Sequence, residues 1–125
     1  MKTNGNERAG GYLCGVTGTN CTSGDWRQAY ANYLVQYITY YKEAGVKLTQ
    51  VGFLNEPDYV ATYSSMLTDG QQAADFIKIL RPTLDKAGYT DVKIACCDTT
   101  GWLKQQDLMP GLSSVSNLLG TITSQ

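Results

Sequence analysis

The chain has 125 residues, 10 basic and 11 acidic side chains, a formal net charge of −1 and no histidine. This length predicts one domain at most, and the balanced charge argues against nucleic-acid or membrane partners. The lack of histidine excludes Ser-His-Asp and Cys-His catalysis and histidine-ligated zinc. Acid–base chemistry therefore depends on carboxylates, tyrosine, lysine or cysteine.

Residues 1–22 are rich in glycine and predict a loop. Residues 1–8 are polar and lack the apolar core of a secretory signal peptide, so we expect none in this chain. No apolar run approaches the roughly 20 residues that span a bilayer. Within the loop, Asn20-Cys21-Thr22 matches the N-glycosylation sequon, which makes Asn20 a candidate acceptor.

Four cysteines occur at positions 14, 21, 96 and 97, in a spacing unlike that of a zinc site. Cys14 and Cys21 form a candidate disulfide that would contribute roughly 2–3 kcal/mol in the chain-entropy model. Together with the sequon, this pair indicates an oxidising, secretory compartment. Cys96 and Cys97 are neighbours in an apolar run. In a strand their side chains would point to opposite faces, so we expect two small buried thiols rather than a bond.

A helix is predicted over 23–45, because apolar and aromatic residues recur at alternating spacings of three and one. That face holds Trp26, Ala29, Tyr30, Tyr33, Leu34, Tyr37, Ile38 and Tyr41. We expect its tyrosine rings to face a sheet, which leaves no exposed aromatic platform. A short apolar strand follows over 48–54, and Asn55-Glu56-Pro57-Asp58 ends it because proline cannot continue the ladder.

The same order then recurs. A second helix is predicted over 69–88 and a second apolar strand over 92–97, followed by the polar stretch 98–102. Residues 102–125 are poorly defined, with a weak helical stretch over 102–108.

The two halves are offset by 43 residues, because Ala44-Gly45 matches Ala87-Gly88. A period of this size also suits helical-pair repeats, but strand-length segments alternating with helices favour a parallel α/β sheet. In such sheets, residues just beyond the carboxyl ends of strands line the active site, and Glu56 and Asp98 hold such positions. Two strands cannot close a (β/α)8 barrel of about 250 residues. Either the sheet is small and open, or the chain is part of something larger.

Three segments in this order resemble glycoside hydrolase family 30. Residues 1–5 with 10–13 look like the segment after that family's third barrel strand. Val51–Tyr59, containing Asn-Glu-Pro, looks like its fourth strand with the acid/base motif. Ile94–Trp102 is similar to the fifth strand of its fungal xylanase-like members. The helix over 23–45 fits the third barrel helix.

The resemblance implies that residues 1–125 are the central fragment of a (β/α)8 TIM barrel, about strands three to five with their helices. Such a fragment is incomplete as a stand-alone domain, and the missing strands are expected in a longer, secreted parent. The implied activity is retaining hydrolysis of β-glycosidic bonds in plant cell-wall polysaccharide, as by an endo-β-1,4-xylanase. The alternatives are a β-1,6-glucanase of the same family and a catalytically silent carbohydrate-binding fragment. The chemistry needs two carboxylates and neither a metal nor a cofactor.

By the same resemblance, Glu56 is the general acid/base and Asn55 binds the sugar 2-hydroxyl. The family's nucleophilic glutamate ends the seventh strand, and neither Glu7 nor Glu43 matches it. This chain therefore carries only the acid/base half and is expected to be inactive alone. Further expected substrate contacts are Trp102, Asp98, Tyr59, Asn4 and Lys2. For Trp102, packing between helix and sheet is an equal alternative, and for Asp98 a helix cap or rim hydrogen bond.

Overall fold

A parallel sheet of three strands, in the order β2-β4-β5, organises the chain. The computed structural model describes residues 11–125, so the contacts predicted for Lys2 and Asn4 lie outside the described residues. In chain order the elements are β1 (Gly11–Tyr12), α1 (Arg27–Glu43), β2 (Gln50–Gly52), β3 (Met66–Leu67), α2 (Gly70–Lys86), β4 (Lys93–Thr99), α3 (Trp102–Leu112), the 3-10 helix η1 (Ser113–Leu118) and β5 (Leu119–Ser124). The predicted α/β class with parallel strands is confirmed.

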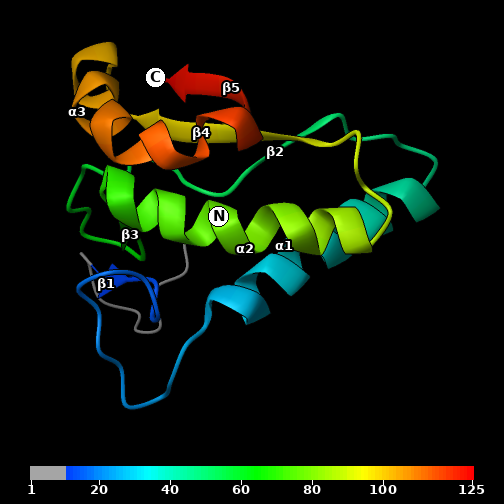
Figure 1. The fold of residues 1–125 in the computed structure, drawn as a ribbon, viewed down its shortest axis with the longest axis horizontal. Helices are drawn as coiled ribbons and strands as arrows, with labels where there is room; N and C mark the ends of the chain where they lie inside the picture. Colours follow the sequence, from blue (N-terminus) through cyan, green and yellow to red (C-terminus); the bar gives the residue numbers. More distant parts are fainter. Residues whose placement is uncertain (1–10) are drawn as a thin grey trace.

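Helices α1 and α2 contact one another, and both lie on the same side of the sheet in Figure 1. Strands β4 and β5 run toward the left of that view, where α3 also lies, whereas α1 ends at the right. A separate parallel pair joins β1 to β3. Among the described residues, no helix is long and apolar enough to cross a membrane.

The core between helices and sheet is aromatic at its centre. The Phe76 ring of α2 lies 4.9 Å from the ring centroids of both Tyr30 and Phe53. The Tyr30 hydroxyl donates a hydrogen bond of 2.6 Å to the Phe53 carbonyl. Burial raises the pKa of Tyr30, so the hydroxyl stays protonated and remains a donor. This bond fixes the backbone two residues before Asn55.

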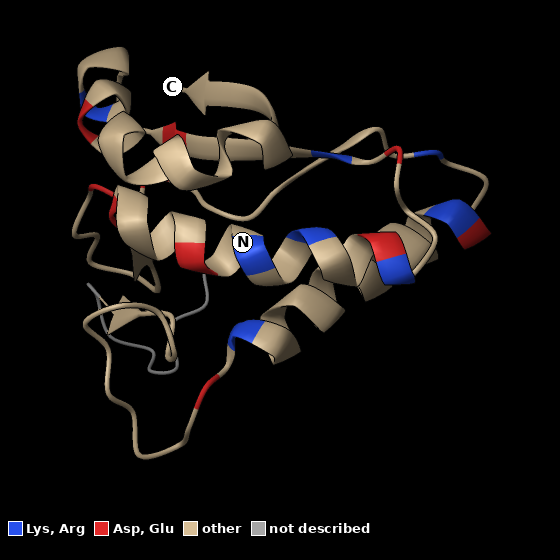
Figure 2. Cartoon of the chain, viewed as in Figure 1, with Lys and Arg blue, Asp and Glu red and all other residues tan. Residues whose placement is uncertain are grey.

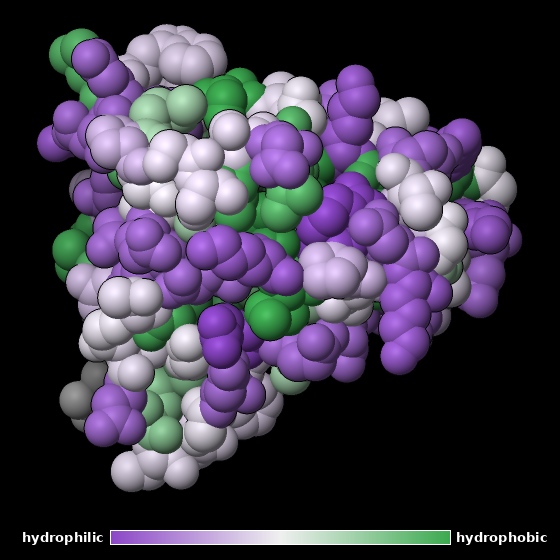
Figure 3. All heavy atoms as spheres, in the orientation of Figure 1, coloured by the Kyte–Doolittle hydropathy of each residue, from purple (hydrophilic) through white to green (hydrophobic). Residues whose placement is uncertain are grey.

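The surface outside this core mixes charges of both signs. Figure 2 shows Lys and Arg interspersed with Asp and Glu along α1 and α2, without a large region of one sign. On the face drawn in Figure 3, hydrophilic side chains predominate and apolar surface is confined to small areas between them.

The predicted orientation of the tyrosines on α1 is confirmed for Tyr30 and wrong for Tyr33, Tyr37 and Tyr41. The buried face consists of Tyr30, Ala31, Leu34 and Ile38, whereas Tyr33, Tyr37 and Tyr41 are 53%, 41% and 39% exposed. These three tyrosines are spaced four residues apart and form a stripe beside the buried face. The prediction failed for them because the apolar face read from the sequence is wider than the part of the helix that contacts the sheet. We call this set the tyrosine stripe.

Cys96 and Cys97 are both buried, as predicted, but the expectation that they remain unbonded thiols is wrong, because the structure joins them in a disulfide. The prediction assumed strict alternation of side chains along a strand. In β4 that alternation is interrupted, since both cysteines are buried and the pairing of β4 with β5 shifts register between Cys97 and Thr99. A second disulfide joins Cys14 to Cys21, whose Cα atoms lie 5.7 Å apart.

The loop between β1 and α1 is anchored to α2 at Thr17. Its backbone N–H and its hydroxyl both donate to Asp75 Oδ2, at 2.8 and 2.6 Å, while Gln72 Nε2 donates to the Thr17 carbonyl at 2.9 Å. Burial acts to raise the pKa of Asp75, but the hydrogen bonds from Thr17 and Gln71 outweigh it and lower the pKa below 3.8.

Because this pKa is lowered by folding, the contact stabilises the fold above the unfolded-state pKa, and that stability is lost as pH falls through the folded-state pKa. We expect Asp75→Asn to destabilise the chain at pH 7 by about 0.5–1 kcal/mol, after allowance for solvent screening. Urea unfolding at pH 7 and pH 3 measures the deficit, which should shrink at pH 3. The exposed Asp107→Asn serves as control, and an equal deficit at both pH values contradicts the assignment.

Candidate active site

The carboxyl ends of β2 and β4 lie side by side, because the two strands pair in parallel with Val51 opposite Ile94. Glu56 follows the end of β2, whereas Asp98 is the next-to-last residue of β4, because that strand continues to Thr99 instead of ending at residue 97 as predicted. The Glu56 backbone N–H donates to the Asp98 carbonyl at 2.8 Å. The structure thus brings the two residues together by a direct backbone bond.

Both residues also share an uncommon backbone conformation. Glu56 has φ of 49° and Asp98 has φ of 61°, in the left-handed region that side chains other than glycine rarely adopt. Such conformations cost free energy and concentrate at functional sites. Both side chains are half-buried, so each carboxylate retains access to solvent.

Asn55 is held from the end of the chain. Its Oδ1 accepts a hydrogen bond of 3.3 Å from Gln125 Nε2, and the Gln125 backbone N–H donates to the Thr99 carbonyl at 2.9 Å. Within residues 11–125 the Asn55 amide nitrogen makes no side-chain hydrogen bond, so it is the group left to donate to a ligand.

Asp58 and Thr100 form a second connection between the two strand ends, which sequence reasoning missed. The Thr100 N–H donates to Asp58 Oδ1 at 3.0 Å, and its hydroxyl donates to the other carboxylate oxygen. Asp58 lies two residues after Glu56 and so fixes the loop that carries it. The sequence signal was the pair of polar stretches after the strands, but their contact requires the pairing register.

Gln105 of α3 is a further residue that the sequence did not reveal. It is fully buried, and its Oε1 accepts from the Cys97 N–H and the Thr99 hydroxyl, both at 3.3 Å. A buried amide of this kind is tolerated because it is hydrogen-bonded. It fixes the end of β4 against α3, and thereby the position of Asp98.

Both predicted aromatic contacts are accessible. Trp102 is the first residue of α3 and is 63% exposed, and Tyr59 is 51% exposed. Within residues 11–125, Trp102 therefore does not pack between helix and sheet. Exposed aromatic faces next to polar groups suit stacking on a sugar ring, which presents apolar C–H groups.

A second carboxylate with acid/base geometry is absent from the described part of the chain. Glu43 is the last residue of α1, which ends at the opposite edge of the sheet from the carboxyl ends of the strands (Figure 1). No group of three potential metal-ligating side chains occurs within residues 11–125.

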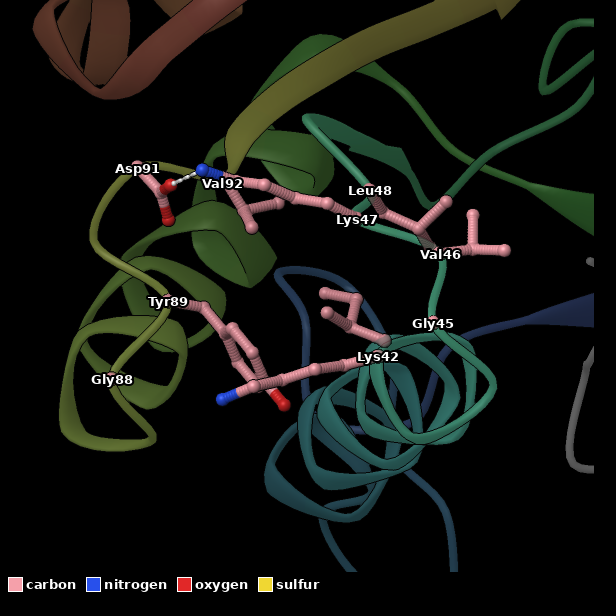
Figure 4. A pocket seen from close by; sticks show the side chains of 10 residues that line it. Lys42, Gly45, Val46, Lys47, Leu48, Gly88, Tyr89, Asp91 and Val92 are labelled. Carbon is pink, nitrogen blue, oxygen red and sulfur yellow. Dashed lines mark ion pairs between the residues drawn. The ribbon is translucent and has the colours of Figure 1, made fainter.

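A hollow of about 440 Å³ also lies at the opposite edge, between the ends of α1 and α2. Figure 4 shows Lys42 reaching toward Tyr89, with its Nζ 5.8 Å from the ring centroid, and Lys47 pairing with Asp91 at 2.8 Å. Within residues 11–125, Asp91 is the only carboxylate that lines the hollow, and it is neutralised by Lys47. The hollow offers no acid/base pair, and the candidate site remains at the carboxyl edge.

No protein-family model matches the chain. Among solved structures, the catalytic domain of glycoside hydrolase family 30 xylanase C from Talaromyces cellulolyticus is 53% identical, with a TM-score of 0.91. That match covers 100% of this chain and 29% of the relative. The chain therefore spans less than a third of the length of this relative.

Two more distant structures share the fold. SrfJ from Salmonella typhimurium is 20% identical, with a TM-score of 0.69 over 99% of this chain and 26% of its own. An endo-β1,6-glucanase is 22% identical, with a TM-score of 0.67 over 79% of this chain and 23% of its own.

The parallel strands and the match along the whole chain indicate that this chain corresponds to a section of a glycoside hydrolase catalytic domain. Along its whole length the chain is similar to a section of a glycoside hydrolase family 30 catalytic domain.

Proposed function

We propose that this chain supplies the acid/base half of a retaining glycoside hydrolase site that cleaves xylan-like β-glycans. The observation that carries the proposal is the position of Glu56, beside Asp98 at the carboxyl edge of the sheet, in a chain 53% identical to part of a xylanase. Retaining hydrolysis uses two carboxyl groups about 5–5.5 Å apart. Glu56 is the first of them.

In this mechanism Glu56 protonates the glycosidic oxygen as the bond to the leaving sugar breaks. It then takes a proton from the water that releases the covalent intermediate. The Asn55 amide donates to the sugar 2-hydroxyl, while Gln125 holds its oxygen. Trp102 and Tyr59 supply apolar stacking surface and Asp98 a rim contact, and Lys2 and Asn4 complete the proposed contacts.

The nucleophile comes from outside this chain, because residues 11–125 place no second glutamate at the carboxyl edge and Glu7 does not match the nucleophile position that the resemblance implies. The isolated chain is therefore catalytically silent, and the remaining strands of a (β/α)8 barrel complete the site. The whole enzyme acts on polysaccharide in a secreted setting, which the Cys14–Cys21 disulfide supports. It needs no cofactor.

A hybrid domain tests this function. The matching section of the Talaromyces xylanase C catalytic domain is replaced by the present chain, whose numbering is kept. We expect the hybrid domain to release xylo-oligosaccharides from xylan with retained anomeric configuration. NMR of the first products measures that configuration. The isolated chain should release none.

The unmodified Talaromyces domain is the positive control. A hybrid domain that folds but leaves xylan intact contradicts the xylanase assignment, and cleavage of β-1,6-glucan instead supports the glucanase alternative. Turnover of xylan by the isolated chain contradicts the half-site proposal.

A second candidate function, carbohydrate binding without hydrolysis, is favoured by the exposed tyrosine stripe. The rings of Tyr37 and Tyr41 lie 4.9 Å apart and are tilted by 51°. Titration of the isolated chain with xylohexaose tests this function, with Tyr37→Ala as the variant that should weaken binding. Binding that is unchanged in Tyr37→Ala, or absent in both proteins, argues against it.

A further inference from the structure

We infer that Asn20 is the attachment site of an N-linked glycan. The sequence has six asparagines, and only Asn20 is followed two positions later by serine or threonine, with a residue other than proline between. That pattern alone arises often by chance. Three observations on the described residues support its use here.

The first observation is accessibility. Asn20 and Thr22 are both exposed, in the segment between β1 and α1 that swings out at the lower edge of Figure 1, away from the body of α1 and α2. The Asn20 side chain makes no hydrogen bond within residues 11–125. A bulky, hydrated glycan at this position displaces no described contact.

The second observation is how this segment is held. Thr17 is bound to Asp75, the Cys14–Cys21 disulfide closes a short loop around the acceptor, and the Gly24 N–H donates to the Cys21 carbonyl at 3.0 Å. These contacts lie on both sides of the acceptor and none involves its side chain. The fold therefore remains intact whether or not the glycan is present.

The third observation is that the sequon itself contains a disulfide-bonded cysteine, and both features are typical of proteins that pass through the secretory lumen. Cys21, the middle residue of the sequon, is bonded to Cys14, and disulfides form and persist in oxidising compartments. Glycan transfer takes place in the same compartment. The disulfide and the glycan thus require one environment, and the disulfide is an observation separate from the sequence pattern.

The reaction is a glycosyl transfer from a lipid-diphosphate-linked oligosaccharide. The Asn20 amide nitrogen forms a bond to the anomeric carbon of the donor, while the bond from that carbon to the diphosphate oxygen breaks. The lipid diphosphate leaves with the bonding electrons, and the amide gives up one proton. No oxidant or reductant takes part.

Cell-free translation of the chain behind a cleavable signal peptide, in the presence of microsomes, tests the inference without depending on the final fold. We expect a slower-migrating product whose glycan is removed by peptide N-glycosidase F. That enzyme leaves aspartate in place of Asn20, which the mass of the peptide detects. Asn20→Gln and Thr22→Val should both abolish the shift. Thr22→Ser should retain it, and Asn117→Gln should leave it unchanged.

A translocated chain, protected from added protease, that shows no glycosidase-sensitive shift overturns the inference. A shift that persists in Asn20→Gln also overturns it. Because the readout is mass and not hydrolysis, the result stands independently of the proposed glycosidase function.

Discussion

Replacing Glu56 with glutamine in the hybrid domain is expected to lower kcat/KM on xylan by about 10²–10⁴-fold, the usual contribution of a general acid/base. Glutamine keeps the size of the side chain and its hydrogen-bonding capacity but cannot give up a proton to the leaving oxygen. The contact with the Asp98 carbonyl uses the Glu56 backbone N–H, so the substitution preserves the geometry of the strand ends.

The choice of substrate separates loss of proton transfer from loss of structure. In an aryl glycoside of an acidic phenol, the phenolate leaves without needing a proton from the enzyme. Formation of the covalent intermediate from such a substrate should therefore be much less impaired than cleavage of xylan. Steady-state kinetics on both substrates, with a burst of phenol release as the second readout, measure the difference.

Glu43→Gln is the matched control, because Glu43 is exposed at the end of α1, and it should retain full activity. Xylan turnover that is unchanged in Glu56→Gln removes this residue from the mechanism. An equal loss on both substrates, accompanied by a lower melting temperature, assigns it a structural role instead.

The position of Glu56 followed from the sequence, whereas the connections that hold it did not. An apolar strand ended by a polar, proline-containing stretch indicates which residues lie at the rim of a parallel sheet. The bonds from Thr100 to Asp58 and from Gln125 to Asn55 join residues 42 and 70 positions apart. Such contacts depend on register and on the path of later elements, which local patterns do not encode.

The limits of periodicity explain the tyrosine stripe. Helical spacing identified α1, but it could not identify which part of a broad aromatic face contacts the sheet. Tyr30 packs there together with Ala31, Leu34 and Ile38, while the three rings of the stripe remain outside. Position around the helix axis, and not hydrophobicity or side-chain size, decided which tyrosines are buried.

The region 102–125 was poorly defined in sequence because its local signals conflict with its structure. Pro110 and Gly111 disfavour a helix interior, yet both lie inside α3. Strand β5 is half-buried along most of its length and lacks the alternation that predicts a strand. Tertiary contacts with α2 and β4 therefore order this region, and one of them is the contact of α3 with α2.

That contact depends on two glycines. A Cβ placed on Gly111 would lie 2.7 Å from the Gly70 Cα and closer still to the backbone nitrogen of Gln71. These are main-chain atoms of α2 and cannot rotate away, so α3 would have to move. We expect Gly111→Ala to lower the free energy of unfolding by about 1–3 kcal/mol, the usual cost of overpacking.

Urea unfolding of the chain measures the loss, and amide hydrogen exchange locates it, with protection falling first over α3, whose Leu108 and Leu112 are buried against the core. Gly52→Ala is the matched control, because its Cβ would meet only the Ala95 carbonyl oxygen, at 3.8 Å. A Gly111→Ala chain as stable as the Gly52→Ala chain would show that α3 is not held by this contact. In that case the Gln105 bonds to β4 and the packing of Leu108 and Leu112 would have to position α3 beside the candidate active site.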